Sequence, residues 1–269
     1  MHYLDRPHGR IAYDLSGPEN SGRLVVCVPG MFDHRASFRF VAERLADAGH
    51  RVAVMDLRGH GDSDAAFEAY TNRAAATDAI ALAEELDGRD VVMVGNSFGG
   101  AAVTIAALER PDLVAGITLL GPFLRTRPTS PAMTLLQRLM VARPWAPWTL
   151  AALYDSLHKG RVPEGHREQK ARVLAMLRPA DRLRAVRATI FGPNEQVLTA
   201  PGLRAEALVM VGEQDPDWPD PRAEAEWVAS VIDGTVEMVP ECGHYPQSQR
   251  PGVVAAGVLR LIAEVDADA

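Results

Sequence analysis

The 269-residue sequence predicts an α/β fold in which a mostly parallel sheet carries helices on both faces. Two observations support this prediction. Short apolar runs alternate with helical patterns through the first 120 residues, and the same alternation resumes near residue 207. The stretch between them is helical in character only, which predicts an insertion. We therefore expect a core of residues 1–122 and 198–269, and a helical cap or lid of residues 123–197.

The individual elements follow from local patterns. The first two strands are expected to form a hairpin that turns at His8 and Gly9. Later strands are apolar runs, and each is followed by a longer helical stretch. The expected strands are 2–4, 10–13, 24–28, 52–55, 91–94, 116–120, 207–211 and 236–239; the expected core helices are 38–48, 74–86, 101–108, 222–231 and 253–265.

The predicted cap contains helical runs at 133–140, 150–157, 168–177 and 182–187, with Pro144 and Pro147 as helix breakers. Its aromatic and methionine side chains either line an apolar acyl or ring pocket or only pack the cap onto the core. Its arginines either recognise an anionic substrate or, as we favour, form a solvated face. The candidate pocket residues are Phe32, Phe123, Met133, Trp145, Trp148 and Tyr154.

The segment Gly95–Gly100 carries the clearest chemical signal. It contains a G-x-S-x-G pattern between an apolar run and an alanine-rich helix, which is typical of a nucleophile elbow. Such a sharp turn needs small residues two positions before and after the serine, and both are glycine here. We expect Ser97 Oγ to stand exposed above the sheet as a nucleophile, beside a helix N-terminus that favours developing negative charge.

A nucleophilic serine needs a base and an orienting acid, which follow it in the order acid, then histidine. His244 comes after the run 236–239, between a glycine and a nearby proline, and is the predicted base. Asp215 comes after the run 207–211 and is the favoured acid, with Asp217 and Glu213 as rivals. Asp215 is expected to hold the tautomer of His244, which takes the proton of Ser97.

An oxyanion hole requires two backbone N–H groups aimed at one point. The expected donors are the amides of Phe98, directly after the nucleophile, and Met31, in the turn after strand 24–28. An ordinary turn at Pro29 and Gly30 is the alternative interpretation. The polar group 33–35 that follows either edges the pocket or, as we favour, begins a helix.

Together these motifs make the chain resemble the α/β-hydrolase superfamily. The resemblance implies the α/β-hydrolase fold with an inserted helical cap and a cofactor-independent serine hydrolase, esterase- or lipase-like. Two positions depart from the common pattern, because Pro29 and Gln249 stand where many relatives have His and Glu. Neither departure removes a residue of the expected triad. The matching motifs, in the family's order, are Pro29–Met31, Asp56–Ser63, Gly95–Gly100, Gly212–Pro216 and Gly243–Pro246.

Composition and short motifs bear on which kinds of partner and cofactor the protein binds. The net charge of −7 argues against a nucleic-acid surface. Neither a run of 18 apolar residues nor a signal peptide is recognised, so we expect a cytoplasmic protein without a membrane span. Two cysteines do not suggest a disulfide scaffold, and Cys242 is a weaker alternative nucleophile. We find no metal-ligand spacing and no phosphate-binding loop, so neither metal nor cofactor is expected.

The sequence therefore predicts hydrolysis of a carboxylic ester-like bond in a small molecule with an apolar acyl or ring group. The same parts would also serve a thioesterase, a carbon–carbon bond hydrolase, an acyltransferase or a cofactor-free haloperoxidase or perhydrolase. A ligand-binding relative without turnover is a further alternative, because fold does not imply function. Substrate identity and oligomeric state do not follow from the sequence.

Overall fold

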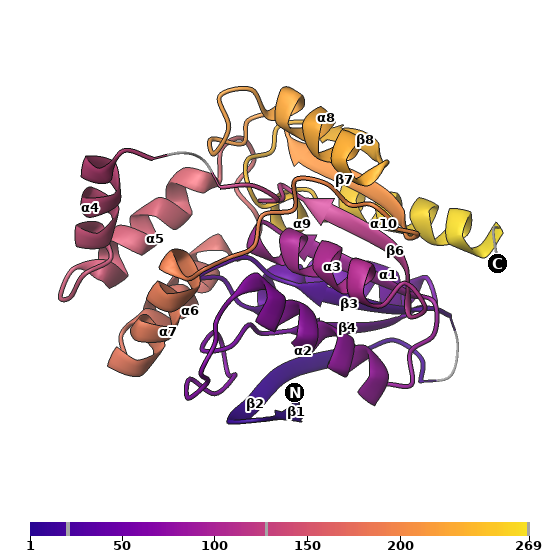
Figure 1. Cartoon of the computed structure of the whole chain (residues 1–269), viewed down its shortest axis with the longest axis horizontal. Coiled ribbons are helices and arrows are strands. Elements are labelled where there is room, and N and C mark those ends of the chain that lie inside the picture. Colours follow the sequence, from indigo (N-terminus) through magenta and orange to yellow (C-terminus); the bar gives the residue numbers. More distant parts are fainter. Residues whose placement is uncertain (20–21, 127–128, 268–269) are drawn as a thin grey trace.

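The computed structural model describes residues 1–19, 22–126 and 129–267 and confirms the α/β-hydrolase fold (Figure 1). Residues 127–128 of the predicted cap lie outside the described part. One eight-stranded sheet runs in the order β1-β2-β4-β3-β5-β6-β7-β8. Among the described strands, β1–β2 and β2–β4 pair antiparallel and the other neighbours pair parallel. The strands are β1 (His2–Arg6), β2 (Gly9–Ser16), β3 (Leu24–Val28), β4 (Arg51–Met55), β5 (Val91–Asn96), β6 (Val114–Leu120), β7 (Glu206–Gly212) and β8 (Thr235–Val239).

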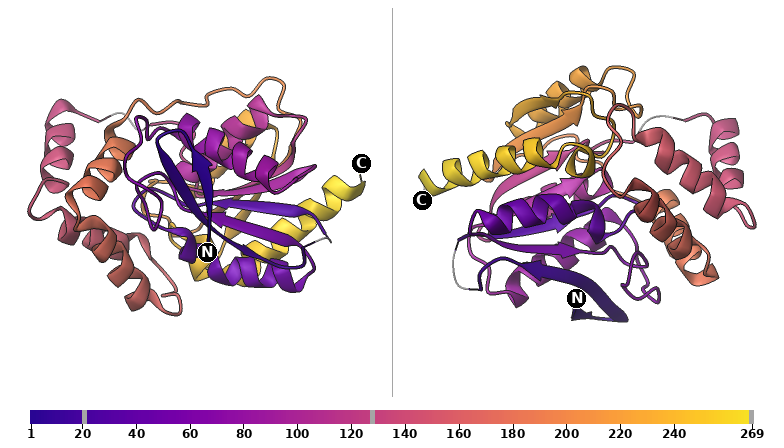
Figure 2. Two further views of the ribbon diagram at one scale, coloured as in Figure 1. Left: turned by 90° about the horizontal axis from the view of Figure 1, so that it is seen from below. Right: turned by 180° about the vertical axis from the view of Figure 1, so that it is seen from behind.

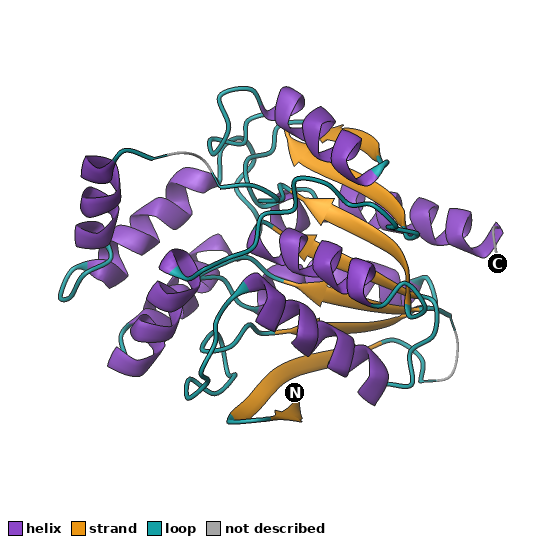
Figure 3. Cartoon of the chain, in the orientation of Figure 1, coloured by secondary structure: helices purple, strands orange, loops and turns teal. Residues whose placement is uncertain are grey.

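Helices cover both faces of this sheet (Figures 2 and 3). One face packs against α2 (Asn72–Glu85), α3 (Phe98–Glu109) and α8 (Pro221–Ile232). The other packs against α1 (Arg39–Asp47) and α10 (Pro251–Ala267). Successive strand residues point to opposite faces, so the fully apolar β3 supplies Val26 to one core and Cys27 to the other.

Between β6 and β7, the part of the chain that the structure describes contains the helices α4 (Pro131–Met140), α5 (Ala146–Leu157), α6 (His166–Leu177) and α7 (Ala180–Phe191). They sit beyond the carboxyl ends of the strands, on the left in Figure 1. Leu150, Tyr154 and Val173 of these helices form an apolar cluster of their own with Phe32 and Tyr245. We refer to these four helices as the α4–α7 segment.

Two short helices are not among the expected core helices, although a helix start at residues 33–35 is the favoured interpretation of the sequence. A 3-10 helix, η1 (Arg35–Phe38), precedes α1, and its N-cap His34 accepts a hydrogen bond from the Ala36 N–H through its ring. The short helix α9 (Pro246–Gln249) directly follows the predicted base. Both elements are about one turn long, which is too short to produce an amphipathic pattern. Within the described residues, no helix has the length and apolar character needed to cross a membrane.

Candidate active site

Ser97 occupies a strained turn between β5 and α3, at the centre of the sheet. Its φ of 55° and ψ of −116° are unusual for a residue with a Cβ atom. The flanking glycines are required by close packing: a Cβ atom on Gly95 would lie 2.2 Å from the oxygen of Gly99, and one on Gly99 would lie 2.2 Å from the oxygen of Val28. The sequence predicts that Ser97 Oγ stands exposed above the sheet. The residue is only 6% exposed and lines a cavity.

His244 contacts two carboxylates through one ring nitrogen. Its Nδ1 atom lies 2.9 Å from Asp215 Oδ2 and 3.1 Å from Asp217 Oδ2. Asp215 is buried and its Oδ1 atom also accepts the N–H of Asp217, which fixes the turn after β7. From the sequence the two aspartates are rivals for one role, whereas the structure brings both to the same imidazole.

The two carboxylates determine the basicity of His244. Burial by itself lowers the pKa of the imidazole, but the charges of Asp215 and Asp217 outweigh burial and raise the pKa to about 9. With its Nδ1 proton held by carboxylates, Nε2 is the nitrogen left to exchange a proton with a neighbour. This arrangement suits a general base whose tautomer is fixed.

Two residues that the sequence analysis did not assign to the site also position His244. Asn96 donates its side-chain N–H to the His244 carbonyl at 3.1 Å and to the Leu120 carbonyl at 2.9 Å. Gly121 has φ 52°, and a Cβ atom there would lie 3.1 Å from Asp215 Oδ2 and 3.3 Å from His244 Nδ1. The available sequence signals were the position of Asn96 directly before the serine and the position of Gly121 directly after β6.

The turn after β3 approaches Ser97 closely. A Cβ atom on Gly30 would lie 3.1 Å from Ser97 Cβ, and Gly30 and Met31 line the same cavity as Ser97. Phe32, the next residue, has a positive φ of 48°. Phe98 begins α3, so its N–H has no acceptor within the helix. These features favour the amides of Met31 and Phe98 as oxyanion donors, which remains a prediction.

Ser97, His244 and Asp217 open into a cavity of about 820 Å³. Its walls come from the turn after β3, the loop after β6 and helices α4, α5 and α7. Of the six candidate pocket residues, Phe32, Phe123 and Met133 line it. Apolar side chains such as Leu150, Leu153 and Ile190 extend the wall away from Ser97. The cavity has the size and character of a small-molecule site.

The other three candidate pocket residues lie outside this wall. Trp145 and Trp148 are 47% and 65% exposed, whereas Tyr154 is 1% exposed and packs against the ring of Tyr245. Helical geometry explains the difference, because Leu150 and Tyr154 share the buried face of α5 and Trp148 falls on the opposite face. These three residues do not line the cavity, and the packing of Tyr154 against Tyr245 fits the alternative interpretation that cap aromatics pack the cap.

Asp33 is a buried carboxyl beside the candidate oxyanion turn. Its Oδ1 atom accepts the His34 N–H at 2.8 Å, and its Oδ2 atom lacks a hydrogen-bond partner among the described residues. Burial raises the pKa of Asp33 to about 7. The favoured interpretation of residues 33–35 as a helix start fits η1, although Asp33 itself is deeply buried.

The glycine-rich loop after β4 is structural, as the resemblance implied. Asp56 is fully buried, and its carboxylate accepts the N–H groups of Arg35 and Asp62 at 2.7 and 2.9 Å. Arg35 also forms an ion pair with Asp56. Through Arg35, the loop thereby fixes the backbone that directly follows the candidate oxyanion turn.

Two other chemistries find little support around His244. Cys242 is fully buried and hydrogen-bonded to Gln249, and burial raises the pKa of its thiol, so its nucleophilic thiolate is disfavoured. Asp215, Asp217 and His244 place three potential metal ligands within 4.8 Å of one another. Both carboxylates face the same imidazole nitrogen, which a hydrogen-bonded pair already explains, so the cluster alone does not indicate a metal.

Comparison with known proteins places this chain in a family. The model of the alpha/beta hydrolase family matches residues 25–257, and the chain belongs to that family. A 2-hydroxymuconate semialdehyde hydrolase from a Pseudomonas species is 27% identical over 247 residues, which cover 87% of this chain and 83% of that protein. An sn-1-specific diacylglycerol lipase from Mus musculus is 32% identical over 109 residues, which cover 39% of this chain and only 34% of the lipase.

Solved structures agree on the fold. A thermophilic esterase from Thermogutta terrifontis superimposes with a TM-score of 0.80 at 24% identity, covering 98% of this chain and 99% of that chain. An enol-lactonase from Burkholderia xenovorans gives a TM-score of 0.78 at 20% identity, covering 97% and 100%. At these identities the similarity establishes the architecture, and the chemistry has to be argued from the site.

Proposed function

We propose that this protein is a cofactor-independent serine hydrolase that cleaves a carboxylic ester-like bond through an acyl-enzyme on Ser97. The observation that carries the proposal is the opening of Ser97 and His244 into one largely apolar cavity, with His244 held by Asp215 at 2.9 Å. A strained nucleophile turn, a base and an orienting acid in this order are the parts that acyl transfer requires.

In the proposed reaction, His244 Nε2 takes the proton of Ser97 as Oγ attacks the carbonyl carbon of the ester. The N–H groups of Met31 and Phe98 stabilise the oxyanion. The tetrahedral intermediate collapses, its bond to the alkoxy group breaks, and His244 returns the proton to the leaving alcohol. Water then gives a proton to His244 and attacks the acyl carbon. The bond between this carbon and Ser97 Oγ breaks as His244 returns the proton to Oγ, which releases the carboxylic acid and restores the serine.

The α4–α7 segment is proposed to act as the cap that selects the substrate, and residues 123–197 to form the insertion. Helices α4, α5 and α7 supply most of the cavity wall distant from Ser97, and this wall is largely apolar. An acyl chain or ring there would lose contact with water, which contributes about 0.8 kcal/mol per buried methylene group. The substrate is therefore expected to carry an apolar acyl or ring group.

Carbon–carbon bond hydrolysis is the second candidate. The Pseudomonas semialdehyde hydrolase aligns over 87% of this chain, a larger share than the mouse lipase does. The same serine, histidine and aspartate would serve that reaction, so the two candidates differ in substrate and not in the proposed nucleophile.

A fluorophosphonate probe and p-nitrophenyl esters from acetate to dodecanoate test the proposal. Labelling and turnover by the wild type are expected, together with the loss of both in Ser97→Ala. Cys242→Ser is the matched control and is expected to retain both. Undiminished turnover in Ser97→Ala would exclude the mechanism. Turnover of a vinylogous diketone in preference to every ester, lost in Ser97→Ala, would favour the second candidate.

A further inference from the structure

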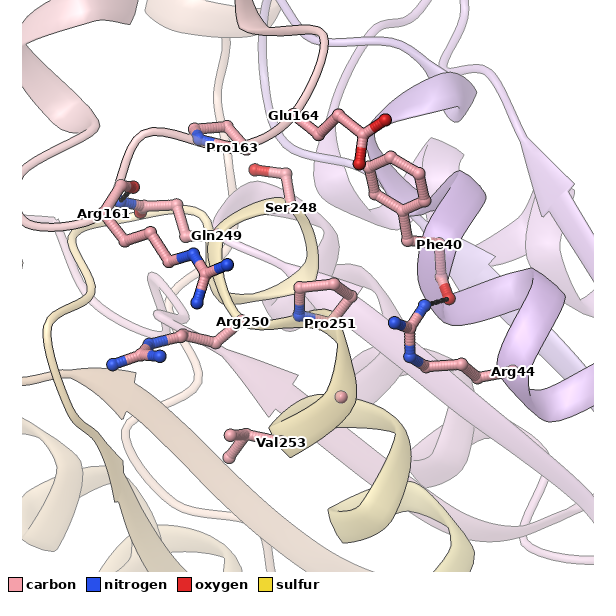
Figure 4. A pocket seen from close by; sticks show the side chains of 11 residues that line it. Phe40, Arg44, Arg161, Pro163, Glu164, Ser248, Gln249, Arg250, Pro251 and Val253 are labelled. Atoms are coloured by element: carbon pink, nitrogen blue, oxygen red, sulfur yellow. Dashed lines mark hydrogen bonds between the residues drawn. The ribbon is translucent and has the colours of Figure 1, made fainter.

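The side chain of Gln249 connects two segments that are distant in sequence. Gln249 is the last residue of α9 and is 2% exposed. One segment is the histidine loop, residues 241–245, which carries His244. The other is the α5 exit segment, residues 157–161, through which the chain leaves the helix that lines the cavity. Gln249 and Arg161 also line a separate pocket of about 300 Å³ (Figure 4).

The oxygen of the Gln249 amide binds the histidine loop. It accepts the backbone N–H of Gly243 at 3.0 Å and that of Tyr245 at 3.3 Å, so it contacts the residues on both sides of His244. The thiol of Cys242 also donates to it, at 3.6 Å. One buried acceptor thus binds two backbone N–H groups and one thiol of the loop around the predicted base.

The nitrogen of the same amide binds the α5 exit segment. It donates to the carbonyl of Lys159 at 2.7 Å and to the carbonyl of Arg161 at 2.8 Å. Both N–H groups of the amide are therefore used. The side chain has no spare donor, and its removal would leave two carbonyls and two N–H groups without their partner.

The two segments also touch directly. His244 donates its N–H to the Leu157 carbonyl, and Arg161 donates its N–H to the Glu241 carbonyl, both at 2.9 Å. Gly160 pairs with Cys242 as an antiparallel bridge. A Cβ atom on Gly243 would lie 2.3 Å from the Leu157 oxygen, so the backbones are in close contact. A displacement of the α5 exit segment would therefore displace the histidine loop.

An amide is the group that this position requires. A carboxylate of the same shape would keep the acceptor for the histidine loop but would lose both donors and face two carbonyl oxygens. The chain carries Gln249 where the resemblance leads one to expect glutamate, and the two donated hydrogen bonds supply a physical reason for that difference.

We propose that Gln249 is a positioning residue, through which the α5 exit segment sets the location of His244 relative to Ser97. The proposal rests on the serine-hydrolase mechanism given above. It means that the Gln249 side chain adds to the direct backbone contacts between the two segments. Through this link the arrangement of the helix lining the substrate cavity is transmitted to the predicted base.

Gln249→Glu tests the donor half of this link. Rates are expressed per active site counted by fluorophosphonate titration, so that unfolded protein does not contribute. At about pH 8 we expect kcat to fall about tenfold with KM changed less than about twofold, because the loss is of base positioning and not of binding. The deficit should shrink toward acidic pH, as the new carboxyl gains a proton and regains a donor.

Gln247→Glu is the matched control. Gln247 is also in α9 and fully buried, and its amide has no hydrogen-bond partner among the described residues. The same substitution there introduces the same buried charge without touching the link. The control is expected to lose stability but to keep kcat per active site. An equal kcat deficit in both variants, or a deficit in Gln249→Glu that does not vary with pH, would overturn the proposal.

Hydrogen exchange supplies a readout that does not depend on catalysis. In Gln249→Glu, the backbone amides of residues 157–161 and those of residues 241–245 should both exchange faster than in the wild type. In Gln247→Glu, the exchange rates of these two segments relative to the rest of α5 should match those of the wild type. Unchanged exchange in either segment would overturn the coupling. If exchange changes as expected but the wild type neither labels nor turns over esters, the proposed function fails and the structural link stands.

Discussion

His244 Nδ1 lies 3.1 Å from the carboxylate of Asp217, which is almost as close as its 2.9 Å approach to Asp215. The two aspartates differ in environment, because the side chain of Asp215 is fully buried while that of Asp217 is 29% exposed. Asp217 also lines the cavity, whereas Asp215 lies behind the imidazole. We therefore expect the two carboxylates to contribute differently to the reaction.

The pH profile of the enzyme should reflect both carboxylates. Asp215 and Asp217 raise the pKa of His244 to about 9, so the imidazole of the free enzyme is mostly protonated at neutral pH. We therefore expect kcat/KM to rise with pH to a plateau above about 9. In Asp217→Asn one of the two charges is lost, so the midpoint of this rise should move to lower pH. An unchanged midpoint would show that Asp217 does not act on the base.

Asp215→Asn should be far more damaging than Asp217→Asn. Asparagine at position 215 can present an N–H to Nδ1 and stabilise the wrong tautomer, and the expected loss in kcat is about 10³–10⁴-fold. For Asp217→Asn we expect less than about tenfold near the plateau, because Asp215 still orients the ring. Steady-state kinetics at matched pH measure both values, and a larger loss in Asp217→Asn would reverse the assignment.

Gly121→Ala is expected to disturb the histidine–carboxylate pair. The added Cβ atom would lie 3.1 Å from Asp215 Oδ2, so the pair must move, and we expect kcat to fall by about tenfold or more. Gly49→Ala is the control for backbone strain, because Gly49 also has a positive φ but a Cβ atom there meets nothing within 4 Å. Its thermal stability should fall while its kcat per active site stays the same.

Stability should depend on Asp33 in a pH-dependent way. Because burial raises its pKa to about 7, the folded state holds a proton that the unfolded state releases, and stability is lost as pH rises from about 4 through 7. Asp33→Asn keeps the acceptor for the His34 N–H and removes the charge. Its melting temperature should exceed that of the wild type at about pH 8 and match it at about pH 4.

The far wall of the cavity should control acyl-chain length. Leu153 lines the cavity, whereas Leu135 on α4 is 59% exposed and does not. Leu153→Trp should lower kcat/KM for long p-nitrophenyl esters by about tenfold and leave the acetate within about twofold, since only long chains reach this wall. Leu135→Trp should leave the chain-length profile unchanged; an equal effect of both variants would contradict the assignment.

The sequence by itself determined the architecture and the order of the candidate site residues. Apolar runs such as 24–28 and 91–94 coincide with β3 and β5, because burial on both faces leaves a signal within five or six residues. Ser97, Asp215 and His244 were recognisable because each lies in the loop that follows such a run, at the sheet edge where strand ends meet.

Only the tertiary structure decided which side chains meet. The sequence does not show that Asp215 and Asp217 share one nitrogen, that Trp148 faces solvent, or that Gln249 joins residue 159 to residue 243. These relationships depend on how loops from separate strands pack and on which face of a helix is buried. Local periodicity carries no information about such long-range contacts, because they arise only when the chain folds and its remote segments come within hydrogen-bonding distance.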